Sequence, residues 1–390
     1  MKKIKFGLLP KIIIAIVLGA VCGLFFPHWA VRIFLTFNGL FGNFLGFVIP
    51  LLILGLVAPG IADLGRGAGR LLLVTVVLAY GFTLFSGFLS YFTCEWIYPH
   101  LSISNTQMDA VEEQIHSLTP YFIIEMPPLM SVMTSLFLAF TLGLGMSVIE
   151  GNRLKGMMDD FKEIINRVIS SVIIPLLPLY IFGIFLNMTK SGQFASMMEV
   201  FLKIIVVIFV MTVVLLLIQF SIAGVVARKN PLRLLKNMLP AYVTALGTQS
   251  SAATIPVTLE QTIKNGVRPD LAGFVVPLCA TIHLSGSTMK IVACSMAIML
   301  MSGMEISLGL YAGFILMLGV AMVAAPGVPG GAIMASLGLL QSMLGFDETA
   351  QALMIALYIA MDSFGTATNV TGDGAIAVIV DRIKSWRAAR

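Results

Sequence analysis

The chain has 390 residues, of which 58% are hydrophobic and only 11% are charged, and its mean hydropathy is +0.98. Soluble domains carry roughly a quarter of their residues as Asp, Glu, Lys or Arg, so soluble enzymes, disordered chains and disulfide scaffolds are excluded. The formal net charge is +5, but the basic residues lie between apolar runs and share no face, so no nucleic-acid partner is expected. The composition predicts an integral protein of the lipid bilayer.

Long uncharged stretches recur through the N-terminal part of the chain. Each is long enough for a helix that crosses a bilayer, which needs about 20 apolar residues. We expect such helices at 12–31, 33–62, 71–94, 126–149, 168–189 and 204–227.

The charges between these stretches predict the orientation. Most of the 24 Lys and Arg residues lie in the N-terminal segment, after the second, fourth and sixth stretches, and in the C-terminal tail. The segment 95–125 is acidic and has neither Lys nor Arg. Because cytoplasmic loops are enriched in Lys and Arg, we expect both termini in the cytoplasm of a multi-pass protein of the cell inner (plasma) membrane.

The C-terminal part breaks this pattern. The uncharged stretches 237–259 and 306–346 are interrupted by Gly, Pro, Ser and Thr at 247–256 and 325–331. Irregular backbone at membrane depth is tolerated only where protein or a water-filled cavity satisfies its polar groups. Two such segments indicate re-entrant hairpins around a substrate site, and two Pro-kinked helices are the alternative.

Polar clusters also lie inside the two remaining apolar stretches. Ala280–Thr288 lies within the predicted helix at 269–304, and Met361–Asp373 lies within the one at 345–381. Polar side chains in a membrane core usually face a cavity or a substrate pathway. These clusters therefore indicate a transport site.

Four motifs in these segments resemble the dicarboxylate/amino acid:cation symporter family, which has the glutamate-transporter fold. Residues 250–256 (SSAATIP) resemble the serine-rich tip of the family's first hairpin, and residues 327–332 (GVPGGA) resemble the tip of the second. Residues 277–287 (PLCATIHLSGS) are similar to the unwound stretch of the seventh helix, and 369–373 (NVTGD) to part of the eighth. Four motifs in order make the resemblance specific.

The resemblance implies an all-α integral membrane protein with eight transmembrane helices and two re-entrant helical hairpins, assembled as a homotrimer. Residues 1–390 would form a single transporter domain in which a transport part moves like an elevator against a scaffold part. The implied bounds are about 1–65 and 119–195 for the scaffold part, about 66–96 and 196–384 for the transport part, about 232–265 for hairpin 1 and about 308–342 for hairpin 2.

The resemblance also implies a substrate site. Asp362 aligns with the carboxylate that holds the substrate α-amino group, Thr366 with a further amino contact, and Asn369 with a contact to the α-carboxylate. The hairpin tip would offer donors to that carboxylate. The implied substrate-binding set is Ser250, Ser251, Ser287, Lys290, Gly327, Val328, Asp362, Gly365, Thr366 and Asn369.

The sequence departs from the family at the clamp for acidic substrates. Acidic amino-acid transporters carry an Arg three residues after the position of Asp362, where this chain has Gly365, or in the first hairpin, where it has Gln249. Lys290 lies seven residues after His283, on the same face if the segment is helical. It either supplies the missing positive charge as a point charge or is a buried counter-ion to Asp362 or Asp373.

The cation sites depart as well. The resemblance implies Na⁺ ligands at Asn369, Asp373, Cys279, Thr281 and His283, but the family's Asn and Asp of helix seven are replaced by His283 and Ser285. Na⁺ prefers oxygen ligands, and an imidazole nitrogen is a poor substitute.

A further Na⁺ site of the family aligns poorly in helix three, with Thr75, Leu78 and Ala79. At least one sodium site should be absent. We expect no cofactor, and Na⁺ and/or H⁺ as the coupling cation.

The predicted function is secondary active symport of a small amino acid, neutral or polar and possibly acidic, with a cation. The alternative is a C4-dicarboxylate:proton symporter that uses Lys290 as its carboxylate partner. A remote alternative is an intramembrane hydrolase built on Ser250, His283 and Asp362 or Asp373. The chain has no Gly-x-Ser-x-Gly nucleophile elbow, so we expect a transporter and not an enzyme.

Overall fold

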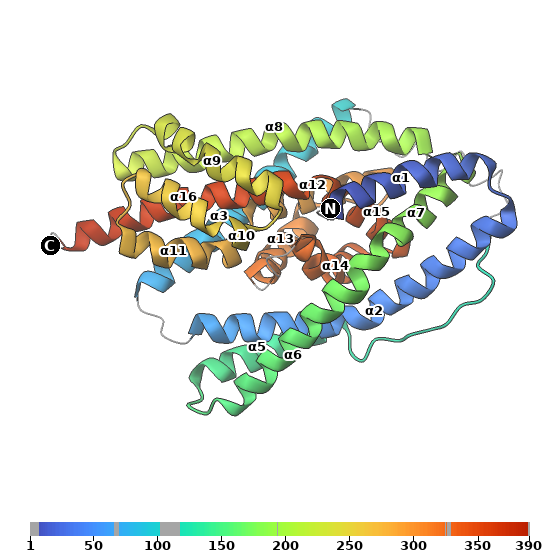
Figure 1. The fold of residues 1–390 in the computed structure, drawn as a ribbon, viewed down its shortest axis with the longest axis horizontal. Coiled ribbons are helices and arrows are strands. Elements are labelled where there is room, and N and C mark those ends of the chain that lie inside the picture. The colour runs from blue at the N-terminus through green and yellow to red at the C-terminus, as the bar shows by residue number, and fades with distance from the viewer. Residues whose placement is uncertain are drawn as a thin grey trace, which may run out of the picture.

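The described part of the computed structural model is all-helical and contains no strand (Figure 1). It comprises residues 8–65, 70–101, 118–192, 194–323, 325 and 329–388. The N-terminal helices are α1 (Leu8–Phe25), α2 (His28–Gly65), α3 (Arg70–Ile97), η1 (Tyr98–Leu101), α5 (Val132–Val148), α6 (Arg153–Val168), the π-helical turn η3 (Ile169–Ile173) and α7 (Ile174–Lys190). The C-terminal helices are α8 (Phe194–Ala227), α9 (Pro231–Thr248), α10 (Ser251–Lys264), α11 (Pro269–Ile282), α12 (Ser285–Met301), α13 (Leu308–Val323), α14 (Gly331–Leu344), α15 (Glu348–Ala360) and α16 (Asp362–Ala388).

Several of these helices are long and apolar enough to cross a membrane. Within the described residues, length and composition give 6 such spans, or 7 if the bent pair of α15 and α16 counts as one. The six are Leu8–Phe25, His28–Asp63, Leu71–Leu101, Arg153–Lys190, Met197–Ala227 and Pro269–Met301. The helical class and the multi-pass membrane character predicted from composition are confirmed.

Two predicted spans begin or end at the wrong residue because of prolines. The span expected at 12–31 ends at Phe25, since Pro27 disfavours helical backbone at the residue before it, and 28–31 open α2 instead. The span expected at 126–149 begins at Val132, after Pro127 and Pro128. There the Ser131 hydroxyl caps the helix by accepting a hydrogen bond from the Thr134 N–H at 3.1 Å.

The basic connection expected before 168–189 is helical instead. The helices α6, η3 and α7 run from Arg153 to Lys190 without a break. Met158 and Ile165 are buried on one side of α6, while Lys155 forms an ion pair with Asp63 at the end of α2, 2.6 Å away. The amphipathic sequence of α6 accounts for the extra helical turns.

Two pairs of short helices lie where the broken stretches predicted hairpins. The helices α9 and α10 pack together, as do α13 and α14, and they contain 18, 14, 16 and 14 residues. The helices α10, α13 and α14 are shorter than the 18 residues of the shortest candidate span, and α9, which also has 18 residues, is not among the candidate spans. The first pair turns at Gln249, which has a left-handed backbone with φ 53°.

Two further helical stretches, both of which carry the polar clusters, are also interrupted. The stretch predicted as one helix at 269–304 breaks at His283 and Leu284, between α11 and α12. The stretch predicted as one helix at 345–381 bends by 61° between α15 and α16, at Met361, so the expectation of a continuous helix there was wrong.

The packing brings these interruptions together. The helix α12 packs against α3, α15 and α16, and α16 also packs against α8, α9, α10 and α11. In Figure 1, α8 runs along one edge and α2 and α5 along the other, with α12 to α15 between them. A Cβ at Gly286 would overlap the Gly365 carbonyl oxygen and Thr368, so glycine permits the close approach of α12 to α16.

Candidate functional site

The centre of the site is the Asp362 carboxylate, at the start of α16. Its side chain is buried, and its Oδ2 atom accepts a hydrogen bond from the Gly330 N–H, at 2.8 Å. Gly330 has φ 76° and lies immediately before α14, so the second helix pair touches this carboxylate directly. The other oxygen, Oδ1, lies 3.6 Å from the ammonium nitrogen of Lys290.

Lys290 is fully buried in α12, and its contacts converge near Asp362. Its Nζ atom donates a hydrogen bond to the Met361 carbonyl at 3.1 Å and lies 3.9 Å from the centroid of the Tyr358 ring. The helical spacing would place Lys290 on the face of His283 only in a continuous helix, and that condition is not met, because the chain breaks at 283–284 and α12 starts a new helix. Of the two carboxylates considered as partners, the structure places Lys290 beside Asp362.

Gly365 lies against Lys290. A Cβ at position 365 would overlap the Cε and Nζ atoms of Lys290. The volume that a side chain at position 365 would need is therefore filled by the lysine.

Asn369 and Ser287 connect α16 to the start of α12. The Asn369 Oδ1 atom accepts hydrogen bonds from the N–H groups of Gly286 at 2.7 Å and Ser287 at 3.4 Å, which caps N–H groups that α12 leaves free. Its Nδ2 atom donates to the Ser287 hydroxyl at 3.1 Å, and the Tyr358 hydroxyl donates to the same oxygen at 2.9 Å. Thr366 is also buried, on the same helix as Asn369.

A second polar cluster joins His283 and Asp373. The His283 Nδ1 atom lies 2.9 Å from Asp373 Oδ1, and both side chains are buried. The Gln219 Nε2 atom donates to the Ser285 hydroxyl at 3.2 Å. Within the described residues His283 Nε2, Asp373 Oδ2 and Gln219 Oε1 have no hydrogen-bond partner.

Gln219 is a residue that the sequence reasoning missed. It lies on α8, and a Cβ at Gly372 would overlap both Gln219 Oε1 and His283 Cε1. The signal for it was a single amide inside the predicted apolar span at 204–227.

Helix α3 brings Phe82 and Ser86 to this cluster. The Phe82 ring contacts the His283 ring, with centroids 6.4 Å apart, and the Ser86 hydroxyl donates to the Ser285 carbonyl at 2.8 Å. The Thr75 hydroxyl instead bonds within α3, to the Leu71 carbonyl. The poor match of Thr75, Leu78 and Ala79 to a further sodium site stays a prediction.

Cys279 and Thr281 do not bring side-chain oxygens to the cluster. The Cys279 thiol is buried. The backbone carbonyl oxygen of Cys279 accepts a hydrogen bond from the His283 N–H at 2.8 Å. Thr281 is exposed, and its hydroxyl bonds to the Leu278 carbonyl. The Thr281 side chain therefore does not join His283 and Asp373 in one ligand set.

The turn between α9 and α10, predicted as the tip of the first hairpin, carries the predicted serines. The Ser250 hydroxyl caps α10 by accepting the Ala253 N–H at 3.3 Å, and Ser251 is buried in the first turn. The tip faces a cavity of about 690 Å³ that is lined by Ala252, Thr281 and Ala325 and reaches Asp63, Lys162 and Arg167. Gly327 and Val328, predicted at the other tip, lie outside the described residues.

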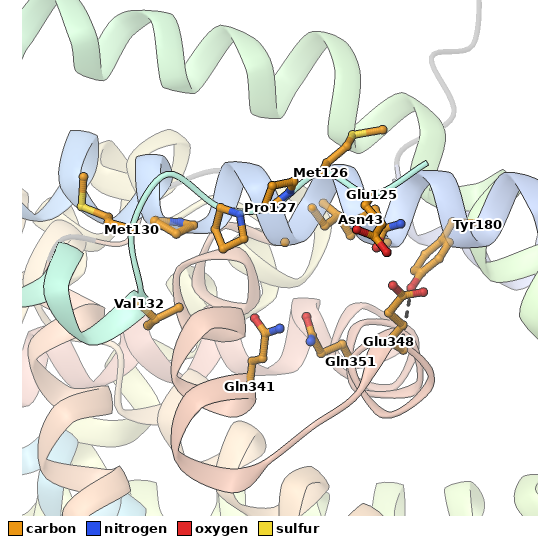
Figure 2. Close-up of a pocket in the computed structure, with 15 residues that line it drawn as sticks. Asn43, Glu125, Met126, Pro127, Met130, Val132, Tyr180, Gln341, Glu348 and Gln351 are labelled. Atoms are coloured by element: carbon orange, nitrogen blue, oxygen red, sulfur yellow. Dashed lines mark hydrogen bonds between the residues drawn. The ribbon is translucent and has the colours of Figure 1, made fainter. Parts of the chain in front are cut away.

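A separate cleft of about 290 Å³ contains none of the predicted site residues. Figure 2 shows it with Asn43, Glu125, Gln341, Glu348 and Gln351 around it. The Tyr180 hydroxyl donates to the Glu348 carbonyl oxygen at 3.2 Å beside it. The substrate-site motifs and this cleft are therefore distinct parts of the molecule.

The residues proposed for a hydrolase do not form a triad. His283 is bonded to Asp373 through Nδ1, but its Nε2 atom has no partner among the described residues. A serine nucleophile activated by this histidine would need that hydrogen bond. The geometry therefore provides no support for the intramembrane hydrolase.

An all-helical membrane protein with broken helices and buried charges at the breaks has the features of a secondary transporter. Residues 8–383 match the sequence pattern of the sodium:dicarboxylate symporter family, and the chain belongs to that family. It is 28% identical over 394 residues to the serine/threonine transporter SstT of Acinetobacter baumannii strain AYE, with 97% of each chain covered. The serine/threonine transporter SstT of strain ATCC 17978 is 27% identical over the same share. The family and these names indicate a transporter rather than an enzyme.

Proposed function

We propose that this protein is a secondary active symporter that couples uptake of a small neutral polar amino acid, such as serine or threonine, to a cation gradient. Asp362 carries the proposal. It is a buried carboxylate that already holds an ammonium group 3.6 Å away, which is the chemistry needed for the α-amino group of an amino acid. The names of the relatives point to the same substrates.

The site favours neutral over acidic substrates. Position 365 has no side chain, and the lysine that fills its volume contacts Asp362 and the Met361 carbonyl. Lys290 is a point charge and provides no bidentate clamp for a side-chain carboxylate. The C4-dicarboxylate alternative has the same difficulty, and dicarboxylates also lack the amino group that Asp362 would bind.

The proposal includes the architecture implied by the resemblance: eight transmembrane helices, two re-entrant hairpins, cytoplasmic termini in the inner membrane, a homotrimer, and elevator movement of the transport part. Two observations support it. The helices α10, α13 and α14 have 14, 16 and 14 residues, fewer than a spanning helix needs, and their partner α9 is not among the candidate spans. The cavity at the Ala252 tip extends to Lys162 and Arg167, at the end predicted to be cytoplasmic, as an inward-facing carrier requires.

Uptake by purified protein in sealed vesicles tests the substrate. We expect radiolabelled L-serine to accumulate under an inward gradient of Na⁺ and H⁺ together. Unlabelled L-threonine should compete with labelled serine. L-aspartate and succinate should not compete, because the chain has Gly365 and Gln249 at the two positions where an Arg would bind a side-chain carboxylate. Accumulation of succinate with no effect of serine would instead favour the dicarboxylate carrier.

The coupling cation is a separate part of the proposal. We propose that protons, or fewer sodium ions than in relatives that retain the family's helix-seven Asn and Asp, drive uptake. The support is that His283 stands where the resemblance implies an oxygen ligand and contacts Asp373 Oδ1 at 2.9 Å. Hard cations bind oxygen in preference to imidazole nitrogen.

Ion replacement checks this coupling. With Na⁺ replaced by choline and an inward pH gradient imposed, serine uptake should persist, or Na⁺ dependence should be shallow. His283→Asn should make uptake more dependent on Na⁺, because it restores the family's residue. A steep Na⁺ dependence with a Hill coefficient of about three and no response to the pH gradient would contradict the proposal.

A further inference from the structure

Lys290 is the buried cation of the site. It is the one Lys or Arg among the described residues whose side chain is fully buried, and it lies on α12, within a predicted membrane span. A charged side chain at membrane depth is costly unless it is paired. Its burial therefore requires a partner in every state of the transport cycle.

The partner in this structure is the carboxylate that the substrate would use. Both oxygens of Asp362 are engaged, Oδ1 by the Lys290 ammonium at 3.6 Å and Oδ2 by the Gly330 N–H at 2.8 Å. The proposed function gives the same carboxylate to the α-amino group of the substrate. The lysine and the substrate amine thus contend for one partner.

Lys290 also has contacts that do not depend on Asp362. Its ammonium donates to the Met361 carbonyl at 3.1 Å and lies over the Tyr358 ring at 3.9 Å. A cation is attracted to the face of an aromatic ring, and a lysine side chain has several rotatable bonds. The ammonium can therefore leave the carboxylate and keep two stabilising contacts.

We propose that Lys290 is a built-in counter-ion that pairs with Asp362 in the substrate-free carrier and is displaced from it by the substrate amine. The inference rests on the proposed function and assigns a role in the cycle. In the loaded carrier, the substrate neutralises Asp362. In the empty carrier Lys290 does so, which lets the empty site move back across the membrane without an unpaired carboxylate.

Lys290→Met separates the two halves of the cycle. Exchange of internal for external serine uses only the loaded carrier and should be retained, whereas net uptake requires the empty carrier to return and should fall about tenfold or more. Serine binding, measured by thermal shift of the purified variant, should become tighter because the competing ammonium is gone. The matched control is Lys203→Met, which removes a lysine that contacts the Leu101 carbonyl and Glu199 away from the site. This control should leave serine exchange, net uptake and serine binding unchanged.

Lys290→Arg gives a second test that keeps the positive charge. A guanidinium can hold a carboxylate through two hydrogen bonds, so this variant should restore net uptake relative to Lys290→Met and should bind serine more weakly than the wild type. This outcome also keeps the inference testable if the methionine variant does not fold.

The inference is wrong if exchange and net uptake fall together in a folded Lys290→Met protein, or if neither changes. It is also wrong if serine binding weakens in that variant, which would make Lys290 a direct substrate contact. A wild-type protein that neither binds nor exchanges any amino acid contradicts the proposed function instead.

Discussion

Asp362→Asn should abolish uptake and exchange of every amino acid that the protein transports. The substitution removes the negative charge proposed to bind the substrate amine, and a hydrogen bond to a charged group contributes roughly 1.5–3 kcal/mol. It also leaves the buried Lys290 ammonium, now 3.6 Å from that carboxylate, with the Met361 carbonyl and the Tyr358 ring alone. Serine binding measured by thermal shift, and serine exchange in vesicles, provide the readouts.

A double variant separates loss of binding from loss of folding. In Asp362→Asn combined with Lys290→Met, neither charge remains, and the melting temperature should recover relative to Asp362→Asn alone. Binding should not recover, because the amine still lacks its carboxylate. If Asp362→Asn alone binds serine with wild-type affinity, Asp362 does not hold the amino group.

Gly365→Arg should inactivate the protein while Lys290 is present, and should redirect it to acidic amino acids when Lys290 is shortened. A Cβ at position 365 overlaps Lys290 Cε and Nζ, so the single variant is overpacked and places two cations together. In the Lys290→Ala/Gly365→Arg double variant, the arginine has room and can bind a side-chain carboxylate through two hydrogen bonds. L-aspartate, which should not compete with labelled serine in the wild type, should compete with it in this double variant.

Gly365→Ala is the matched control for this overlap. It adds only the Cβ, so it should lower the melting temperature in the wild-type background and have a much smaller effect beside Lys290→Ala, a coupling that a double-mutant cycle measures. Equal effects in both backgrounds would show that Lys290 does not fill the volume beside position 365.

The membrane character and most spans followed from the sequence because the bilayer imposes a length and an apolar composition on each helix. The stretches at 33–62, 71–94 and 204–227 correspond to α2, α3 and α8. The predicted helix ends were less accurate where prolines or amphipathic residues, and not mean hydropathy, set the helix bounds. Pro27 and the pair Pro127 and Pro128 shortened two spans, and the amphipathic residues of α6 lengthened a third.

The breaks in the helices were only partly predictable. The polar cluster at 280–288 marked the interruption at His283, since polar backbone at membrane depth needs a special environment. The bend at Met361 has no Pro or Gly at that residue, and it depends on the packing of α15 and α16 against different neighbours.

The sequence predicted individual residues of the site but not the contacts between them. Polar or charged side chains are rare in apolar spans, and this predicted Asp362, Asn369 and His283 as site residues. The motifs around them implied their roles. Gln219 and Ser86 were not predicted, because nothing in the sequence of a helix identifies the distant residue that a polar side chain contacts.

The sequence by itself determined that this chain spans a membrane, which segments break, and which residue types lie at the breaks. Only the tertiary structure decided the pairings, because they join residues far apart in the chain: Lys290 with Asp362, and His283 with Asp373. A continuous helix would place Lys290 on the same face as His283, but the break at 283–284 starts a new helix, and the two side chains contact different carboxylates. Periodicity holds within one helix, and the packing of α12 against α16 sets which charges meet.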